Sequence, residues 1–516
     1  MKKLIIAASL LYAVNLSAQN AAISSRDFWS DNPDLATVKA ELEKEKFSFK
    51  DVKAGDDPLS LAINNDAPIA VINYLASQPG VDFKRGIHEG RTYLHSAASK
   101  GNAAAVDCLL KKGADMYYAD AHGQTGLTYA AYMGKITLPV IEAFVKNGLD
   151  VKRKYENKDD ANILLLSAPS DKDLSITNYL VSKGVSLQST DKNGNTAFNY
   201  AARLGNIDVL KALLQKGVKY NENALFMAAQ GPFRSANKID VFQFLVDEVK
   251  IDPKATNKAG QNVLHLLSAK QRQDDIIAYF VNKGVDINKT DNNGNTPFMA
   301  MAGTANMSTL TSLLPNVKNI NVINAKGESA LLNAVKSASP EIIALLIKNG
   351  ADVNVVDKEG NNLAYHLVNS YRGAGGRGGF GGGFGGGQQN AGSADAGPKP
   401  VDIFGEKLKL LQAGGLNFAA PLKDDNTLYH IAITKNDPDL LKKIASLGID
   451  VNAKNKEGLT VLHQAAMLAR NDSALRYLLS IGAKKDIKTS FDETAYDLAK
   501  ENEILSKGNV AVDFLK

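Results

Sequence analysis

The chain has 516 residues, of which 44% are hydrophobic and 22% are charged, and this composition excludes a disordered or collagen-like protein. Its 60 basic residues outnumber the acidic ones by five, an excess too small for a dedicated nucleic-acid binder. We therefore expect no nucleic-acid partner. The 42 glycines against 15 prolines are unusual, and their positions prove informative.

Residues 1–18 have the pattern of a secretory signal peptide. Lys2 and Lys3 precede an apolar run from Leu4 to Leu16, and Ala18 stands at a small-residue cleavage position. The run is shorter than the roughly 20 apolar residues that cross a bilayer, and no later stretch reaches that length. We expect cleavage and export, to the periplasm or the medium, with no transmembrane segment afterwards. An uncleaved N-terminal anchor is the alternative.

The only cysteine, Cys108, lies in a helical pattern and cannot form an internal disulfide. No activating base is close in the sequence. We expect it to act as a small buried hydrophobic residue rather than a nucleophile.

A repeat of about 33 residues runs through most of the chain. Its first motif is clear at Thr92-Tyr93-Leu94-His95 and again at Thr460-Val461-Leu462-His463. Aligned on the opening residue, the repeats start at 57, 92, 125, 162, 196, 223, 262, 296, 329, 362, 426, 460 and 494. The spacing is abnormal at 362–426, and removing the glycine tract brings it close to the others.

The residue pattern of each repeat predicts a turn followed by two helices. In one example, Gly194 allows a tight turn, Thr196 caps a helix over Ala197 to Leu204, and Gly205-Asn206 end it. A second apolar pattern follows and ends at Gly217. One such unit cannot bury its own apolar face, so neighbouring units are expected to stack.

These motifs resemble the ankyrin repeat, whose Thr-Pro-Leu-His, Ala, Leu-Leu, Gly-Ala-Asp and Val-Asn pattern matches Thr92 to Asp115 and Ile343 to Asn354. The resemblance covers nearly all of residues 57–516. It implies an all-α ankyrin-repeat solenoid of about 13–14 helix-turn-helix units with short β-hairpin turns. The repeats at 162 and 223 lack the histidine, and we expect them to be irregular.

The domain organisation follows from these boundaries. Residues 24–56 form a degenerate N-terminal capping repeat with Trp29 packed against the stack, and residues 57–372 form ankyrin repeats. Residues 373–400 are a Gly-rich flexible loop inserted within a repeat, whose second helix lies near Asp402 to Leu411. Residues 401–516 complete the repeats and the C-terminal cap, with a last helix expected near Val510 to Leu515.

The sequence offers no catalytic or metal-binding constellation, so we predict no enzyme activity, catalytic residue, cofactor or metal. By the resemblance, His95, His265 and His463 hydrogen-bond to neighbouring turns. His366 and His430 stand one position later in consecutive repeats, but they have neither a cysteine nor a zinc-type spacing around them.

The resemblance implies a protein partner held in the concave groove formed by hairpins and first helices. Contacts in the family come from positions beside the turn glycine and after the Ala-Ala pair. The residues at these positions are His122, Gln124, Tyr132, Met133, Lys192, Asn193, Asn195, Arg203, Leu204, Asn292, Asn293, Asn295, Lys456 and Glu457.

We therefore predict a non-enzymatic, monomeric protein-protein interaction scaffold, exported by a bacterium. The alternative is recognition of cell-envelope polysaccharide or peptidoglycan along the groove, through Tyr117, Tyr118, Tyr132 and Tyr155. A purely mechanical spacer is a third possibility.

Overall fold

A computed structural model describes residues 22–52, 55–231, 237–268, 270, 273–304, 307–372 and 402–516. The predicted signal peptide (1–18) and the whole predicted Gly-rich loop (373–400) lie outside these residues. The chain divides into two halves, Met1–Ala255 and Thr256–Lys516, and each is described by itself.

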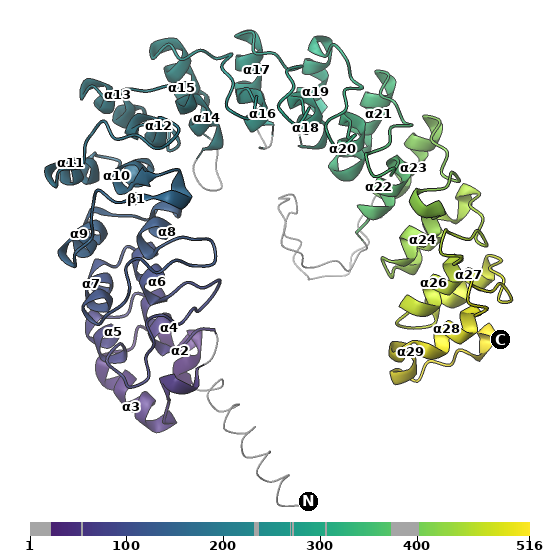
Figure 1. The fold of residues 1–516 in the computed structure, drawn as a ribbon, viewed down its shortest axis with the longest axis horizontal. Coiled ribbons are helices and arrows are strands. Elements are labelled where there is room, and N and C mark those ends of the chain that lie inside the picture. Colours follow the sequence, from purple (N-terminus) through teal and green to yellow (C-terminus); the bar gives the residue numbers. More distant parts are fainter. Residues whose placement is uncertain are drawn as a thin grey trace, which may run out of the picture. The chain divides into compact units, whose positions relative to one another are not determined.

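The first half begins with a cap and continues as paired helices (Figure 1). The cap comprises η1 (Ala22–Ser24), α2 (Arg26–Ser30), α3 (Leu35–Glu45) and η2 (Phe49–Asp51). Its Trp29 is buried, and the indole Nε1 donates to Ile23 O at 2.8 Å.

In each repeat of the first half, a first helix is followed by a second one. The first helices are α4 (Pro58–Asn64), α6 (Tyr93–Ser99), α8 (Gly126–Tyr132), α10 (Ile163–Ser167), α12 (Ala197–Ala202) and α14 (Asn223–Gln230). The second helices are α5 (Ile69–Leu75), α7 (Ala103–Lys111), α9 (Leu138–Lys146), α11 (Ser175–Ser182), α13 (Ile207–Gln215) and α15 (Ile239–Gln243).

The second half repeats this arrangement. Its first helices are α16 (Val263–Leu267), α18 (Pro297–Thr304), α20 (Ala330–Ser337), α22 (Leu363–Asn369), α24 (Leu428–Ile433), α26 (Val461–Leu468) and α28 (Ala495–Glu501). Its second helices are α17 (Asp274–Asn282), α19 (Met307–Leu313), α21 (Pro340–Lys348), α23 (Ile403–Ala413), α25 (Pro438–Ile444), α27 (Ser473–Ser480) and α29 (Glu503–Lys507).

The core lies between successive helix pairs, where the apolar stripe of each helix is buried. A fully buried leucine such as Leu94 or Leu210 contributes about 2 kcal/mol to stability. Small residues let first helices approach closely. A Cβ on Gly126 would lie 3.1 Å from Leu94 O, so α6 and α8 pack with backbone almost in contact. The predicted stacking of helix pairs is confirmed.

The repeats at 162 and 223 are irregular, as predicted. The first follows a two-stranded antiparallel hairpin, β1 (Lys154–Tyr155) and β2 (Ala161–Asn162), with η3 (Glu156–Lys158) between the strands, and η4 (Ala168–Ser170) continues its short α10. The second repeat continues α15 into a π-helix, η5 (Phe244–Glu248), and ends with Lys250 at φ 68°, where other repeats have glycine.

Further 3₁₀ turns complete the second half: η6 (Leu314–Asn316), η7 (Lys423–Asp425), η8 (Ala445–Leu447) and η9 (Asp513–Leu515). The prediction of a last helix near Val510 to Leu515 was wrong, because α29 already ends at Lys507 and only η9 follows. Gly508 and Asn509, interpreted as its entry, end α29 instead.

Candidate partner-binding surface

The turns before α12 and α18 are each organised around one buried acceptor, Asp191 and Asp291. Asp191 Oδ1 accepts from the backbone N–H groups of Asn193 (2.8 Å) and Asn195 (2.9 Å), and Gly194 adopts φ 79° between them. Asp291 holds Asn293 and Asn295 in the same way, each at 2.9 Å. The two residues after the aspartate are thereby placed at the tip of the turn.

Backbone hydrogen bonds join neighbouring tips into ladders. In the second half, Asn292 N donates to Ala259 O (2.9 Å), and Lys358 N donates to Lys326 O (2.8 Å). Between them, Ala325 N donates to Asn293 O at 2.7 Å. In the first half, Lys192 N donates to Asp159 O (2.8 Å) while its ammonium lies 3.0 Å from Asp159 Oδ1. The tips between residues 259 and 358 therefore form a continuous row, and Lys192 joins one pair of neighbouring tips in the first half.

Most of the predicted contact residues lie on these rows or at first-helix ends with accessible side chains. Exposed residues are His122, Tyr132, Lys192, Asn292, Asn293, Lys456 and Glu457. Half-buried residues are Met133, Asn193, Arg203, Leu204 and Asn295.

Gln124 and Asn195 are buried, with 6% and 4% of their surface exposed, so their side chains do not belong to an accessible contact surface. Asn195 Nδ2 donates to Asp191 Oδ2 (2.8 Å), and its Oδ1 accepts from Asn223 (2.7 Å). The position after the turn glycine therefore faces the next repeat, which the resemblance alone did not reveal.

The tyrosines named for glycan binding do not form one exposed platform. Tyr155 is buried, and the Arg153 guanidinium lies 4.3 Å from the centre of the Tyr117 ring. Tyr132 remains the exposed member, at 47%.

His95, His265 and His463 have the structural role that the resemblance implied. In each case Nδ1 accepts from the backbone N–H of the helix cap, and Nε2 bonds the carbonyl of the next turn, as for His95 with Thr92 N (3.2 Å) and Gln124 O (2.8 Å). His265 bonds Asn295 O (3.1 Å) and His463 bonds Ile487 O (2.9 Å). Burial lowers the pKa of all three rings.

His430 belongs to this same group. The cap of α24 is Thr427 rather than Asn426, so His430 stands in the ordinary position and bonds Leu459 O at 3.0 Å. The comparison of internal repeats therefore placed the start of this repeat at 426, one residue too early. The prediction of two equivalent offset histidines was therefore wrong.

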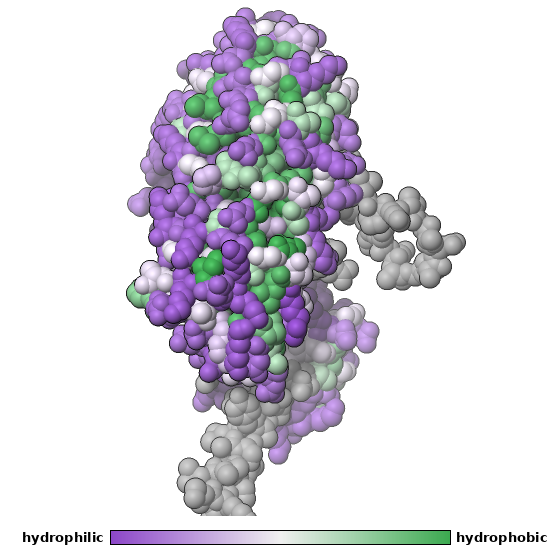
Figure 2. Space-filling model, turned by 90° about the vertical axis from the view of Figure 1, so that its right-hand side faces the viewer, coloured by the Kyte–Doolittle hydropathy of each residue, from purple (hydrophilic) through white to green (hydrophobic). Residues whose placement is uncertain are grey.

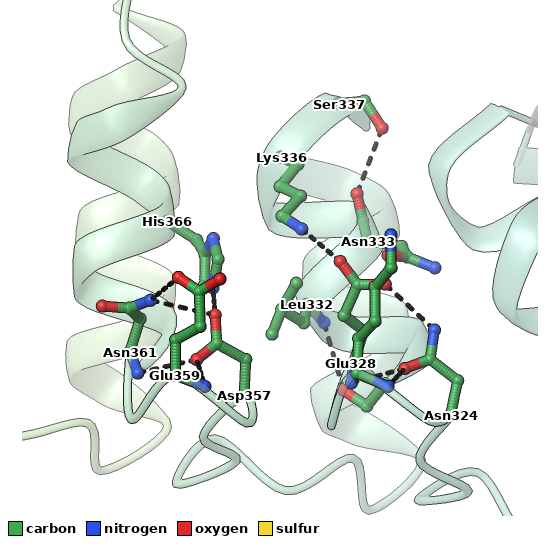
Figure 3. A network of polar contacts seen from close by, with 12 residues as sticks. Asn324, Glu328, Leu332, Asn333, Lys336, Ser337, Asp357, Glu359, Asn361 and His366 are labelled. Atoms are coloured by element: carbon green, nitrogen blue, oxygen red, sulfur yellow. Dashed lines mark hydrogen bonds and ion pairs between the residues drawn. The ribbon is translucent and has the colours of Figure 1, made fainter.

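His366 alone is offset, and it belongs to a polar network (Figure 3). Its Nε2 lies 2.9 Å from Asp357 Oδ2, and Asn361 Nδ2 donates to the same oxygen at 3.1 Å. Beside it, Lys336 donates to Glu328 at 2.7 Å. Burial, and next the charge of Lys336, lower the pKa of His366. Among the described residues no group of three or more metal-ligating side chains converges.

Cys108 is half-buried rather than buried, and its Sγ lies 3.5 Å from Asn73 Oδ1. Burial raises the pKa of the thiol, which opposes nucleophilic chemistry at neutral pH.

Several exposed hydrophobic residues escaped the sequence interpretation. Met467 (41% exposed) and Leu468 (46%) follow Ala465-Ala466, the same slot as Arg203-Leu204, and Phe491 (82%) stands at a turn tip. The Ala465-Ala466 pair was therefore the sequence signal that could have identified Met467 and Leu468 as candidate contact residues. Figure 2 shows that hydrophobic residues also gather in a band between hydrophilic ones on the face that it presents.

The fold and the turn rows define a repeat scaffold that presents a surface rather than an enclosed site. A family model of three ankyrin repeats matches residues 59–155, 138–224, 163–257, 225–307 and 405–505, and a single-repeat model matches 326–355. The chain belongs to the ankyrin-repeat family. Such repeats suggest a protein-protein interaction scaffold, and ankyrin-repeat domains are typically non-catalytic.

Matches to curated relatives cover limited stretches of this chain. The chain is 30% identical over 210 residues to palmitoyltransferase AKR1 of Lachancea kluyveri, covering 39% of this chain and 28% of that protein. It is 31% identical over 126 residues to a transient receptor potential cation channel subfamily A member 1 homolog of Caenorhabditis elegans, covering 24% and 10%. It is 32% identical over 132 residues to putative ankyrin repeat protein FPV223 of fowlpox virus, covering 25% and 89%. None of the described helices is long and apolar enough to cross a membrane.

Proposed function

We propose that this protein is a non-enzymatic scaffold, exported to the periplasm or the medium, that binds a protein partner along its turn tips and first helices. The observation that carries the proposal is the laddered row of tips, which holds exposed residues from successive repeats in register. A preorganised row loses little conformational entropy when a partner binds.

The export part of the proposal rests on the composition of residues 1–18. Fractionation of the native host, with immunodetection of the chain and an N-terminal sequence of the mature form, tests it. A full-length chain confined to the cytoplasm would contradict it.

Affinity capture from envelope and medium fractions tests the binding part. The wild-type chain is compared with Asn292→Arg/Asn293→Arg and with Lys192→Glu, which change exposed tips in each half. Lys348→Glu serves as the control, since Lys348 is exposed at the end of the second helix α21.

We expect one retained protein that both tip variants lose, with roughly tenfold weaker binding, and that the control keeps. Retention that is equal in all variants would contradict the tip assignment. The absence of any retained protein would favour the mechanical spacer, and binding to purified envelope glycan that Tyr132→Ala abolishes would favour the alternative.

A further inference from the structure

A row of basic residues runs along the turns that connect first to second helices in the first half. Lys100 follows α6, Lys135 follows α8, Lys172 follows η4, and Arg203 follows α12. The three lysines are exposed and Arg203 is half-buried. We call these four residues the basic turn edge. It lies at the opposite end of the helices from the turn tips.

Contacts between successive turns show that the row is continuous. A Cβ on Gly101 would lie 3.9 Å from Lys135 O, and one on Gly134 would lie 4.0 Å from Ser170 Oγ. Farther along the row, η4 contacts α12, and Arg203 is the residue directly after α12. Figure 1 shows the same order of α6, α8, α10 and α12. These four successive repeats thus each contribute one cation to the edge, whereas the preceding repeat has the exposed Asp66 in the turn after α4.

None of these cations pairs with a carboxylate among the described residues. Arg203 Nε donates to a backbone oxygen, Gly231 O, at 3.0 Å. The acidic groups nearby are mostly committed elsewhere. Asp171 is buried and accepts from Thr177 N (2.7 Å), and Asp173 accepts from Ser175 N (3.0 Å). Asp208 is exposed, and no ion pair joins it to Arg203.

Accessible apolar side chains also lie along the basic turn edge. Tyr132 and Met133 end α8 beside Lys135, and Leu204 follows Arg203. A surface of unpaired cations interleaved with accessible aromatic and aliphatic groups complements an acidic chain that also carries apolar side chains.

We propose that the basic turn edge binds an extended acidic segment of a protein, in which acidic residues recur at about every third position. Packed helices lie about 8–10 Å apart, and an extended chain advances about 3.3 Å per residue, so three residues span one repeat. This inference rests on the proposed protein-binding function but places the contact on another edge and gives the partner a chemistry.

The test uses the full chain and a fluorescent peptide that repeats Asp-Leu-Ser four times. The reference peptide has the same composition with its aspartates consecutive. Affinities are measured by fluorescence polarisation at about 50 mM and about 300 mM salt, where screening differs strongly. Single-stranded RNA and an anionic polysaccharide are competitors.

The test variant is Lys100→Gln/Lys135→Gln/Lys172→Gln. The matched control is Lys84→Gln/Lys216→Gln/Lys219→Gln, which removes the same charge from exposed lysines outside the turns that join first to second helices. We expect the spaced peptide to bind at least about tenfold more weakly to the test variant, while the control stays within about twofold. Higher salt should weaken the wild-type complex.

Equal affinity for the two peptides, or an equal loss in both triple variants, would overturn the proposal. So would displacement of the peptide by RNA or polysaccharide at lower concentration than by unlabelled peptide. If the spaced peptide fails while the tip variants still lose a captured protein, the turn-edge inference fails and the proposed function stands. If capture also yields nothing, both fail.

Discussion

One lysine occupies a position that other repeats fill with an aliphatic residue. Lys407 precedes the left-handed Gly415 by eight residues, as Ile342 precedes Gly350 and Val209 precedes Gly217. It is 8% exposed, and its ammonium donates to Val335 O near the end of α20 at 3.1 Å. Burial lowers the pKa of Lys407. The amine thus caps a helix end but carries a desolvation cost.

We predict that Lys407→Met stabilises the chain by about 1 kcal/mol at neutral pH, because a buried charge without a carboxylate partner is replaced by an apolar side chain of similar length. A lowered folded-state pKa penalises stability fully below that pKa. The penalty disappears as pH rises from the folded value to the unfolded value near 10.4. The advantage of the variant should therefore shrink in alkali. Urea unfolding of both chains at about pH 7 and about pH 9.5 measures this, and a less stable variant at neutral pH would contradict it.

Among the elements, the last helix pair depends on one asparagine that joins the start of α29 to the end of α26. Asn502 is buried, and its Nδ2 donates to Ala466 O (3.0 Å), Met467 O (3.2 Å) and Ala469 O (2.9 Å). Its Oδ1 caps α29 by accepting from Ile504 N at 2.9 Å. Asn237 reaches the carbonyl oxygens of Ala202 and Ala228 in the same way.

We predict that Asn502→Ala destabilises the C-terminal helices by about 2–3 kcal/mol, since it leaves helix-end carbonyl groups buried without donors and removes a cap. Hydrogen exchange should become faster in α28 and α29 and remain unchanged in α16 to α20, because repeats interact with their neighbours. Ser506→Ala, at an exposed residue within α29, is the control. Unchanged protection in α28 and α29 would refute the prediction.

The helix starts were largely predictable because turn chemistry and capping are local. The first-helix caps lie at the predicted positions, for example Thr92, Thr196 and Thr460, and differ by one residue only at Glu222 and Thr427. Burial within the candidate surface was not predictable. Asn195 turns toward the next repeat because Asp191 and Asn223 bond it there, and such inter-repeat contacts have no signature in a single repeat.

At the scale of the whole molecule, the capping histidines recur in both halves, at 95, 265, 430 and 463. The backbone N–H of Thr92 points at His95 Nδ1, so the neutral ring carries its proton on Nε2 and donates to Gln124 O. Protonation would place a second N–H opposite the Thr92 N–H. Burial, opposed by the carbonyl contact, lowers the pKa of each ring.

We predict that the chain loses stability as pH falls from about 7.5 to about 5.5. A lowered folded-state pKa means that the unfolded chain binds protons first, at a histidine pKa near 6.5, with a slope of at most about 1.4 kcal/mol per pH unit for each ring. Glutamine at the third helical position can still close a capping box and does not titrate. His95→Gln/His463→Gln should therefore be about 1–2 kcal/mol less stable at about pH 7.5, through loss of the carbonyl bonds, yet show a shallower slope. Urea unfolding across this pH range measures both the stability at about pH 7.5 and its slope with pH. Parallel pH profiles of stability for the variant and the wild type would show that these rings do not set the acid sensitivity.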